Sequence, residues 1–384
     1  YGLQNKLGID CDNRITVVNP YQMLGEINET LRRRMFIDVI GLSGTKNIFG
    51  YMNSGWKEWT MFDGTPVLVP EHFNTIPDKS GDILMYPQGD RSVPPSARMP
   101  KGGYYFDAII RQKPIDEDHL DPADNLEEFG LLTEEDIAVL SRKAEYIRSN
   151  TDYAVIYGMN ETSFGDVAFI PGPGLTNPKG IRDIEEWYIS LLIRRDYVYE
   201  VFDRLCEYAI ANLERVHQAA GNCIDIFDVT ETDFGTQRGP FVSPDLYRDL
   251  FQPFHKRICD WIHTHTNWKT FMHSCGGVRP LIPDFIEAGF DILNPVQCSA
   301  EGMDAQNLKN DFGEKIVFWG GGIDTQQTLP FGSPEEVYSQ VRERIDIFNR
   351  GGGYVFNPIH NIQAGTPAQN IMSMLEALED SFPI

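Results

Sequence analysis

Residues 268–277 have the sequence WKTFMHSCGG, in which an apolar run ends at a histidine and a cysteine. Residues 268–272 predict a short buried strand, and the two glycines allow the backbone to turn sharply after it. Residues 279–288 then predict a helix. A strand, a turn and a helix form the repeating unit of α/β proteins, which keep their chemistry at the carboxyl ends of the strands. We therefore expect His273 and Cys275 to lie at such an end.

The second half of the 384-residue chain alternates between short apolar segments and helix-forming segments. This alternation predicts right-handed βα units. With this many units we expect an α/β fold of the closed (β/α)8 TIM-barrel type rather than an open sheet, with two further strands drawn from the first 150 residues. The candidate strands are residues 154–157, 223–229, 268–272, 290–296, 316–319 and 354–356.

Helix starts are readable in the same region. SPEE at 333–336 and TPAQ at 366–369 each combine a capping-box pattern with proline at the first helical position. Residues 184–219 carry apolar side chains at helical spacing, which predicts an ordinary core-facing helix without a functional role.

The first 150 residues differ in character. Residues 44–130 are rich in glycine, proline, aspartate and aromatic residues without clean periodicity, which predicts hairpins and loops that form a cap or insertion. We expect 1–150 to supply the N-terminal part of the barrel with this elaboration, and 151–384 to form the main body. The acidic run 115–128 is typical of a solvated loop.

Composition excludes several classes of protein. A formal net charge of -23 would repel a phosphate backbone, so nucleic acid is not an expected partner. No apolar run approaches the roughly 18 residues that a membrane span requires. The cysteines are too sparse for a disulfide-built secreted scaffold, so we expect reduced thiols and a cytoplasmic location. They are Cys11, Cys206, Cys223, Cys259, Cys275 and Cys298.

Side chains that follow the predicted strands should converge on one mouth of the barrel. They are Glu231, Asp233, His273, Cys275, Gln297, Cys298, Asn357, His360 and Asn361. Such a mixture of nitrogen, sulfur and oxygen donors suits zinc. Three protein ligands with an open fourth position would make a catalytic site.

His273 and Cys275 are the first two candidate ligands. The alternative is a buried cysteine beside a histidine that hydrogen-bonds a backbone carbonyl. For the third ligand we prefer His360, in the loop after the last strand, over Cys298, because a cysteine in such a place is more often a small buried hydrophobe. Glu231 is either a fourth ligand or the general base.

Other polar residues at the predicted mouth are candidates for binding substrate. Asp228, near the end of the predicted strand 223–229, and Asp233, shortly after it, either orient substrate or cap a helix. The glycines 320–322 lack the lysine of a P-loop and the spacing of a dinucleotide fingerprint, so we expect them to let the backbone approach a ligand. Asp324, next to them, should point at the mouth. Gln297 and Asn357 complete this set.

Five motifs occur in an order that resembles the uroporphyrinogen decarboxylase superfamily, over roughly residues 150–380. They are DFGTQRGP at 233–240, SPDLYR at 243–248, PFHKRI at 253–258, HSCG at 273–276 and GGGID at 320–324. The resemblance implies a (β/α)8 barrel with its active site at the C-terminal mouth.

That superfamily contains two chemistries. Its true decarboxylases carry an N-terminal Arg-Gln-Ala-Gly-Arg motif, which the run Arg32-Arg33-Arg34 does not reproduce. The other branch comprises corrinoid-dependent methyltransferases similar to those that methylate coenzyme M, with zinc held by a His-x-Cys motif and a later cysteine. His273 and Cys275 match the first two positions, and His360 stands at the later one. A site with fewer thiolates is a stronger Lewis acid, which favours an ether or amine over a thiol substrate.

The resemblance therefore implies a zinc-dependent methyltransferase that moves a methyl group between a small methylated substrate and the corrinoid of a separate protein. Glu231 or Asp233 would handle the proton, and Tyr104 and Tyr105 would help to wall the substrate pocket. We favour an O-methylated aromatic substrate because the 44–130 segment is rich in aromatics. Two alternatives stay open, a metal-free decarboxylase or lyase using Asp228, Asp233 and Asp324, and a non-catalytic protein that binds a corrinoid partner. The direction of transfer and the oligomeric state also stay open.

Overall fold

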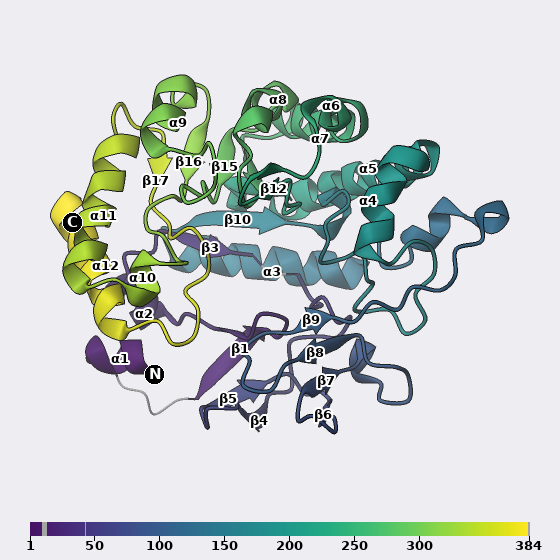
Figure 1. Ribbon diagram of the computed structural model, residues 1–384, viewed down its shortest axis with the longest axis horizontal. Helices are drawn as coiled ribbons and strands as arrows, with labels where there is room; N and C mark the ends of the chain where they lie inside the picture. The colour runs from purple at the N-terminus through teal and green to yellow at the C-terminus, as the bar shows by residue number, and fades with distance from the viewer. Residues whose placement is uncertain (10–13, 43, 383–384) are drawn as a thin grey trace.

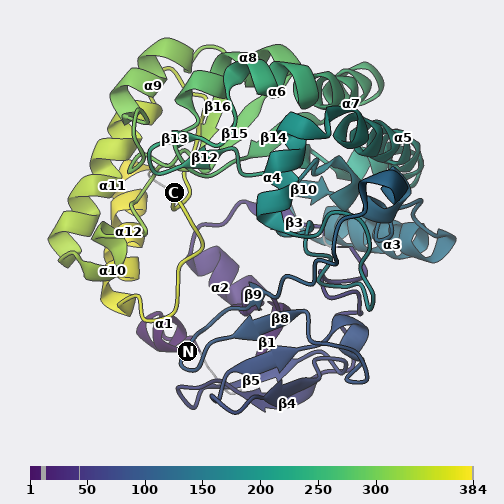
Figure 2. The same cartoon turned by 45° about the vertical axis from the view of Figure 1, so that its right-hand side comes forward.

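The computed structural model describes residues 1–9, 14–42 and 44–382, and its main body is a curled parallel sheet surrounded by helices (Figures 1 and 2). The sheet has seven strands, and every neighbouring pair is parallel. Their spatial order follows the chain, which is the arrangement of a TIM-barrel-like fold. In order across the sheet they are β3 (Val39–Gly41), β10 (Ala154–Gly158), β11 (Ile226–Thr230), β14 (Lys269–His273), β15 (Ile292–Asn294), β16 (Val317–Trp319) and β17 (Tyr354–Val355).

The six strands predicted from the second half of the chain are confirmed. The strand predicted at 223–229 begins later, at Ile226, because residues 221–223 form a 3₁₀ turn at the end of the preceding helix. The first 150 residues contribute β3 to this sheet. Within the described ranges the sheet therefore has one strand fewer than the eight of the predicted barrel, and β3 and β17 are its edges.

Helices cover the outer face of the sheet, as the alternating pattern predicts. Most follow the strand that precedes them in sequence and return the chain to the next strand. The helices are α1 (Gly2–Lys6), α2 (Glu29–Arg34), α3 (Glu134–Asn150), α4 (Ile184–Ile193), α5 (Arg195–Ala220), α6 (Pro244–Leu250), α7 (Gln252–His265), α8 (Ile282–Ala288), α9 (Ala305–Phe312), α10 (Thr328–Phe331), α11 (Pro334–Phe348) and α12 (Ala368–Ser381). None of the helices in the described part of the chain is both long enough and apolar enough to cross a membrane.

Of three helix features predicted from the sequence, one is confirmed and two differ in the structure. The capping box of α11 is confirmed, since Ser333 and Glu336 each accept a hydrogen bond from the other's backbone N–H. The one predicted for α12 is wrong. Pro367 has extended backbone angles and is itself the residue before the helix, so Thr366 makes no cap. The segment 184–219 forms two helices, α4 and α5, because Arg194 leaves helical geometry between them.

Two small sheets precede the main body and share an apolar core that includes Phe49, Phe73, Met85 and Phe106. Arg111 donates hydrogen bonds to the carbonyls of Gly172 and Leu175 in the loop after β10, and this loop starts at the carboxyl end of its strand. The small sheets lie below β3 and α3 in both views, and Arg111 ties them to this loop (Figures 1 and 2). The first comprises β1 (Ile15–Asn19), β2 (Leu24–Gly25), β4 (Lys57–Thr60) and β5 (Pro66–Val69), and the second β6 (Thr75–Pro77), β7 (Ile83–Met85), β8 (Ala97–Met99) and β9 (Asp107–Ala108).

The inside of the curled sheet has its own apolar floor. Side chains alternate between the two faces of a strand, so those that do not pack against the outer helices point into the curled sheet. Ile226, Phe271 and Ile292 form a separate buried cluster, with Trp319 packed against it. The next inward-facing positions toward the carboxyl ends of the same neighbouring strands are Gly158, Asp228, His273 and Asn294. This ring of four positions, directly above the floor, frames the site.

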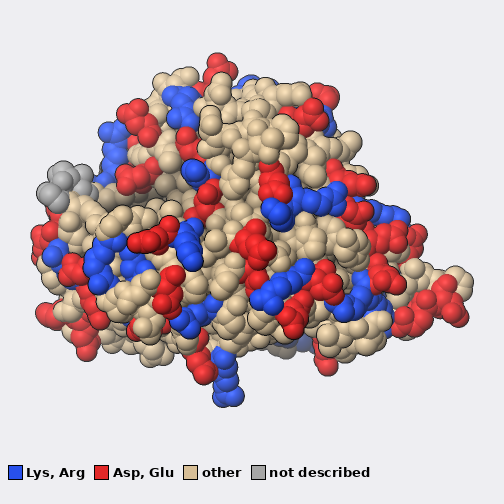
Figure 3. Space-filling view, turned by 90° about the horizontal axis from the view of Figure 1, so that it is seen from above, with Lys and Arg blue, Asp and Glu red and all other residues tan. Residues whose placement is uncertain are grey.

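Acidic and basic side chains are interspersed on the face seen in Figure 3, and no continuous basic surface occurs on it. With a net charge of -23, acidic groups prevail in the whole chain.

Candidate metal centre

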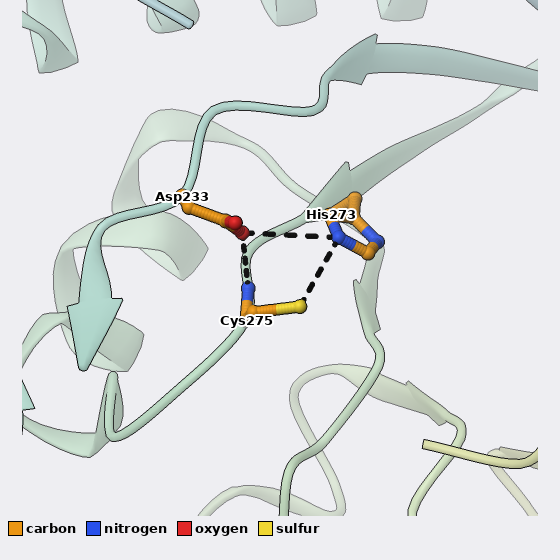
Figure 4. Close-up of side chains that lie close together, drawn as sticks. All are labelled: Asp233, His273 and Cys275. Carbon is orange, nitrogen blue, oxygen red and sulfur yellow. Dashed lines mark hydrogen bonds and ion pairs between the residues drawn. The ribbon is translucent and has the colours of Figure 1, made fainter. Parts of the chain in front are cut away.

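Asp233, His273 and Cys275 come together at the carboxyl ends of β11 and β14 (Figure 4). One potential ligand atom from each lies within 4.8 Å of the others. His273 Nε2 is 3.4 Å from Cys275 Sγ and 3.8 Å from Asp233 Oδ1. The side chains of His273 and Asp233 are 31% and 37% exposed, so a ligand can reach them from solvent.

Two backbone turns hold this cluster together. Gly276 has φ +86°, and a Cβ there would lie 2.4 Å from the carbonyl carbon of Gly235, so only glycine allows the turn after β14 to pack on the loop after β11. The Cys275 N–H donates a 2.6 Å hydrogen bond to Asp233 Oδ1, and the Phe234 N–H donates to Ser274 Oγ. These contacts fix the three candidate ligands relative to one another.

A hydrogen bond to Asn294 sets the tautomer of His273. Asn294 Nδ2 donates to the carbonyl of Trp319, so its Oδ1 is the atom that faces His273 Nδ1, at 2.6 Å. Nδ1 therefore carries the proton, and Nε2 presents a lone pair to Cys275 and Asp233. Histidines that bind metals are commonly oriented by such a partner on the other ring nitrogen.

The thiol of Cys275 is protonated in the absence of a cation. Burial raises its pKa to about 12, and the neighbouring carboxylate of Asp233 acts in the same direction. A divalent cation would stabilise the thiolate, and an imidazole nitrogen, a sulfur and a carboxylate oxygen are donors that zinc accepts. The residues present therefore fit a zinc ion.

Buried acidic groups surround the cluster. Burial, together with the charges of Glu231 and Asp233, raises the pKa of Asp166, in the loop after β10, to about 7. Burial and the neighbouring Glu231 hold the pKa of Asp228 well above its ordinary value. Tyr188 of α4 senses the same charges, since burial, Asp233 and Asp166 raise its pKa to about 12.

Asp166 and Tyr188 were not among the residues predicted from the sequence. Asp166 lies eight positions beyond the last residue of β10, too far to be assigned to a strand end. Tyr188 lies in a helix with ordinary apolar spacing. The one sequence signal for Asp166 is that it is an acidic residue in the loop after a predicted strand.

Neither of the two residues considered for the third ligand joins the cluster in the described structure. His360 is exposed, and its Nδ1 is 3.2 Å from the carbonyl oxygen of Asn361. Its loop turns toward the small sheets, where Asn361 donates to Gln22. Cys298 packs against the outer core, and burial raises its pKa to about 11. Asp233 takes the third position instead.

Several predicted substrate residues serve local structure. Gln297 Oε1 accepts from the Gly276 N–H at 2.8 Å and so supports the turn of the cluster. Asp324 Oδ1 accepts from the Gln326 N–H, and Asn357 donates to the Pro358 carbonyl. Tyr104 donates to Asp63 on the small sheets, and Tyr105 is 52% exposed.

Residues 175–381, more than half of the chain, match the sequence profile of the family described as uroporphyrinogen decarboxylase (URO-D). The chain belongs to this URO-D family. The resemblance found in the sequence motifs is thereby confirmed.

Relatives from both branches of the family match the chain. A methylcobamide:CoM methyltransferase, MtaA, from Methanosarcina barkeri is 23% identical over 203 residues, which are 53% of this chain and 53% of the relative. A uroporphyrinogen decarboxylase from Coxiella burnetii is 22% identical over 192 residues, 48% of each. The chain thus spans about half the length of the curated relatives it matches. A solved methyltransferase from Methanosarcina mazei shares the fold over 99% of both chains, with a TM-score of 0.54 and 14% identity.

Proposed function

We propose that this chain is a zinc-dependent methyltransferase that moves a methyl group between a small methylated substrate and the corrinoid of a separate protein. The convergence of Asp233, His273 and Cys275 at the strand ends carries the proposal. The similarity to a methylcobamide:CoM methyltransferase supports it and suggests the corrinoid partner.

Zinc would be held by His273 Nε2, Cys275 Sγ and an oxygen of Asp233, and would act as a Lewis acid on the heteroatom that exchanges the methyl group. The chain itself orients these donors. Asn294 fixes the imidazole, and Asp233 binds the backbone of Cys275 as well as facing the cluster. The two turns exclude bulk water from one side of the site, since Ser274 and Gly276 are buried.

An O-methylated aromatic compound is the substrate we favour. The floor of the barrel supplies an aromatic pair, since the rings of Phe271 and Trp319 are T-shaped with centroids 5.3 Å apart. Phe271 precedes His273 by two positions on the same strand and points to the same inner face. A planar ring resting there would hold its methoxy group near the cluster.

Two further assignments are part of this proposal. We place the protein in the cytoplasm, which the free thiols of the five described cysteines support; Cys11 lies outside the described residues. We also propose that residues 1–150 contribute the N-terminal part of the barrel with a cap at 44–130, and residues 151–384 its main body.

Metal content and methyl transfer test the proposal together. The purified protein should contain about one zinc per chain by plasma mass spectrometry, and a His273→Ala, Cys275→Ala variant should contain none. With a phenyl methyl ether and free cob(I)alamin, the native protein should form methylcobalamin and the phenol. Metal-free protein without transfer from any ether or methylamine tested would instead favour a metal-free decarboxylase, which the uroporphyrinogen decarboxylase relatives keep as the second candidate.

A further inference from the structure

Asp228 lies on the inner face of β11, two positions after Ile226 of the apolar floor. Strand pairing sets Asp228 opposite Gly158 on β10 and Phe271 on β14. His273 follows Phe271 by two positions and therefore faces the same interior. A Cβ on Gly158 would lie 3.0 Å from the Asp228 Cβ, so the absence of a side chain there leaves room for this carboxyl group.

Most of the surroundings of Asp228 disfavour its charged form, and a backbone hydrogen bond from Thr230, the weakest of these influences, acts in the opposite direction. Its Oδ1 atom is buried and has no hydrogen-bond partner among the described residues. The charged groups that act on it are both acidic, Glu231 in the following loop and Asp166 in the loop after β10. On the β14 side the nearest inward titratable group is His273, whose Nε2 faces Cys275. Burial and these like charges raise the pKa of Asp228 well above its ordinary value and so favour the protonated acid.

A protonated acid beside the cluster matches a requirement of ether demethylation. When the carbon–oxygen bond of an aryl methyl ether breaks, its electron pair stays on the oxygen, which becomes a strongly basic phenolate unless it receives a proton. The Co(I) corrinoid supplies the electron pair of the new carbon–cobalt bond and becomes methyl-Co(III). Release of the neutral phenol therefore takes up one proton on the leaving oxygen.

We propose that Asp228 is the catalytic acid that delivers this proton to the heteroatom that loses its methyl group. The inference rests on the proposed function and adds the residue that completes its proton balance. Asp228 is left as a carboxylate, and solvent returns its proton after the phenol departs. Among groups near the cluster, Asp228 combines an inward position, a buried unpartnered oxygen and a neighbour without a side chain.

The dependence of rate on the leaving group tests this role. Asp228→Asn would be compared with the native protein on anisoles whose ring substituents span weakly to strongly acidic phenols, with free cob(I)alamin as acceptor. We expect the variant to lose about 10²–10⁴-fold in kcat on the least acidic phenol and little on nitrophenyl methyl ether. The native rate should also fall as pH rises through the pKa of Asp228, and that limb should vanish in the variant.

Two further variants make each outcome decisive. Asp228→Glu keeps an acid and should retain the shallow dependence on phenol acidity, whereas Asp245→Asn, on the exposed surface of α6, should match the native protein. An equal loss on all ethers in Asp228→Asn, with zinc retained, overturns the acid role. Absence of transfer in the native protein overturns the proposed function itself and is recognised before any variant is compared.

Discussion

His273 Nδ1 lies 2.6 Å from Asn294 Oδ1, and this contact between neighbouring strands determines which nitrogen of the imidazole faces the candidate metal centre. Asn294 is itself fixed by donation to the Trp319 carbonyl on the next strand. Three adjacent strand ends thus orient one ligand. This makes the tautomer of His273 a property of the sheet rather than of the turn that carries Cys275.

Replacing Asn294 should weaken metal binding without removing a ligand. Asn294→Leu keeps the approximate shape of the side chain and removes the acceptor for Nδ1. We expect the affinity for zinc to fall about 10–100-fold, as for other partners of metal-bound histidines. Competition with a chromophoric chelator measures this. Asn310→Leu, at an exposed position of α9, is the control, and an unchanged affinity in Asn294→Leu contradicts the orienting role.

Gly276 should be irreplaceable for two separable reasons, its left-handed backbone and its contact with Gly235. Gly64 has nearly the same φ, +85° against +86°, but open space around its missing Cβ. We expect Gly64→Ala to lower the free energy of unfolding by about 1–2 kcal/mol through backbone strain alone. Gly276→Ala should cost roughly 1–3 kcal/mol more through the clash, and should lose zinc. Denaturant unfolding compares them, and equal losses would show that the two turns separate easily.

The structure favours Asp233 as the third ligand and the sequence motif favours His360, and substitutions at the two positions distinguish them. Asp233→Asn keeps an oxygen to accept from the Cys275 N–H but removes the charge that faces the cluster. Loss of a residue that only hydrogen-bonds a metal ligand lowers metal affinity by up to about 100-fold. We expect the zinc affinity of Asp233→Asn to fall by more than this. His360→Ala should bind zinc like the native protein, because His360 is exposed and outside the cluster. Loss of zinc from His360→Ala would restore the ligand set expected from the sequence.

The sequence predicts the sheet, places all three clustered residues at its strand ends and identifies two of them as ligands, for a physical reason. Buried parallel strands are largely apolar runs, and His273 ends one of them, with Cys275 two residues later. The third ligand depends on how two loops pack. His360 follows the last strand just as closely, but its loop turns toward the small sheets through Asn361. Asp233 is selected by its bond to the Cys275 backbone, which no spacing in the sequence reveals.

Asp166 should make the stability of the protein depend on pH in a definite direction. Burial raises its pKa in the folded protein to about 7, from an ordinary value of 3.8, so the folded state binds this proton more tightly than the unfolded chain. The resulting stabilisation is complete below the unfolded pKa and is lost as pH rises toward the folded one. An asparagine cannot ionise and can still accept from the Ala168 N–H, as Asp166 does. Between about pH 4 and pH 7, the native protein should therefore lose stability relative to Asp166→Asn, by on the order of a few kcal/mol.

Urea unfolding of both proteins at pH 5 and pH 8 measures this difference. The free energy of unfolding of the variant, relative to that of the native protein, should be larger at pH 8 than at pH 5. Asp245→Asn serves as the matched control, because Asp245 is 95% exposed and its carboxylate stays solvated in both states. A constant difference between Asp166→Asn and the native protein would mean that Asp166 titrates alike in the folded and unfolded chains. In that case a counter-charge or water reaches the loop after β10, and the surroundings of Asp166 are more polar than its burial indicates.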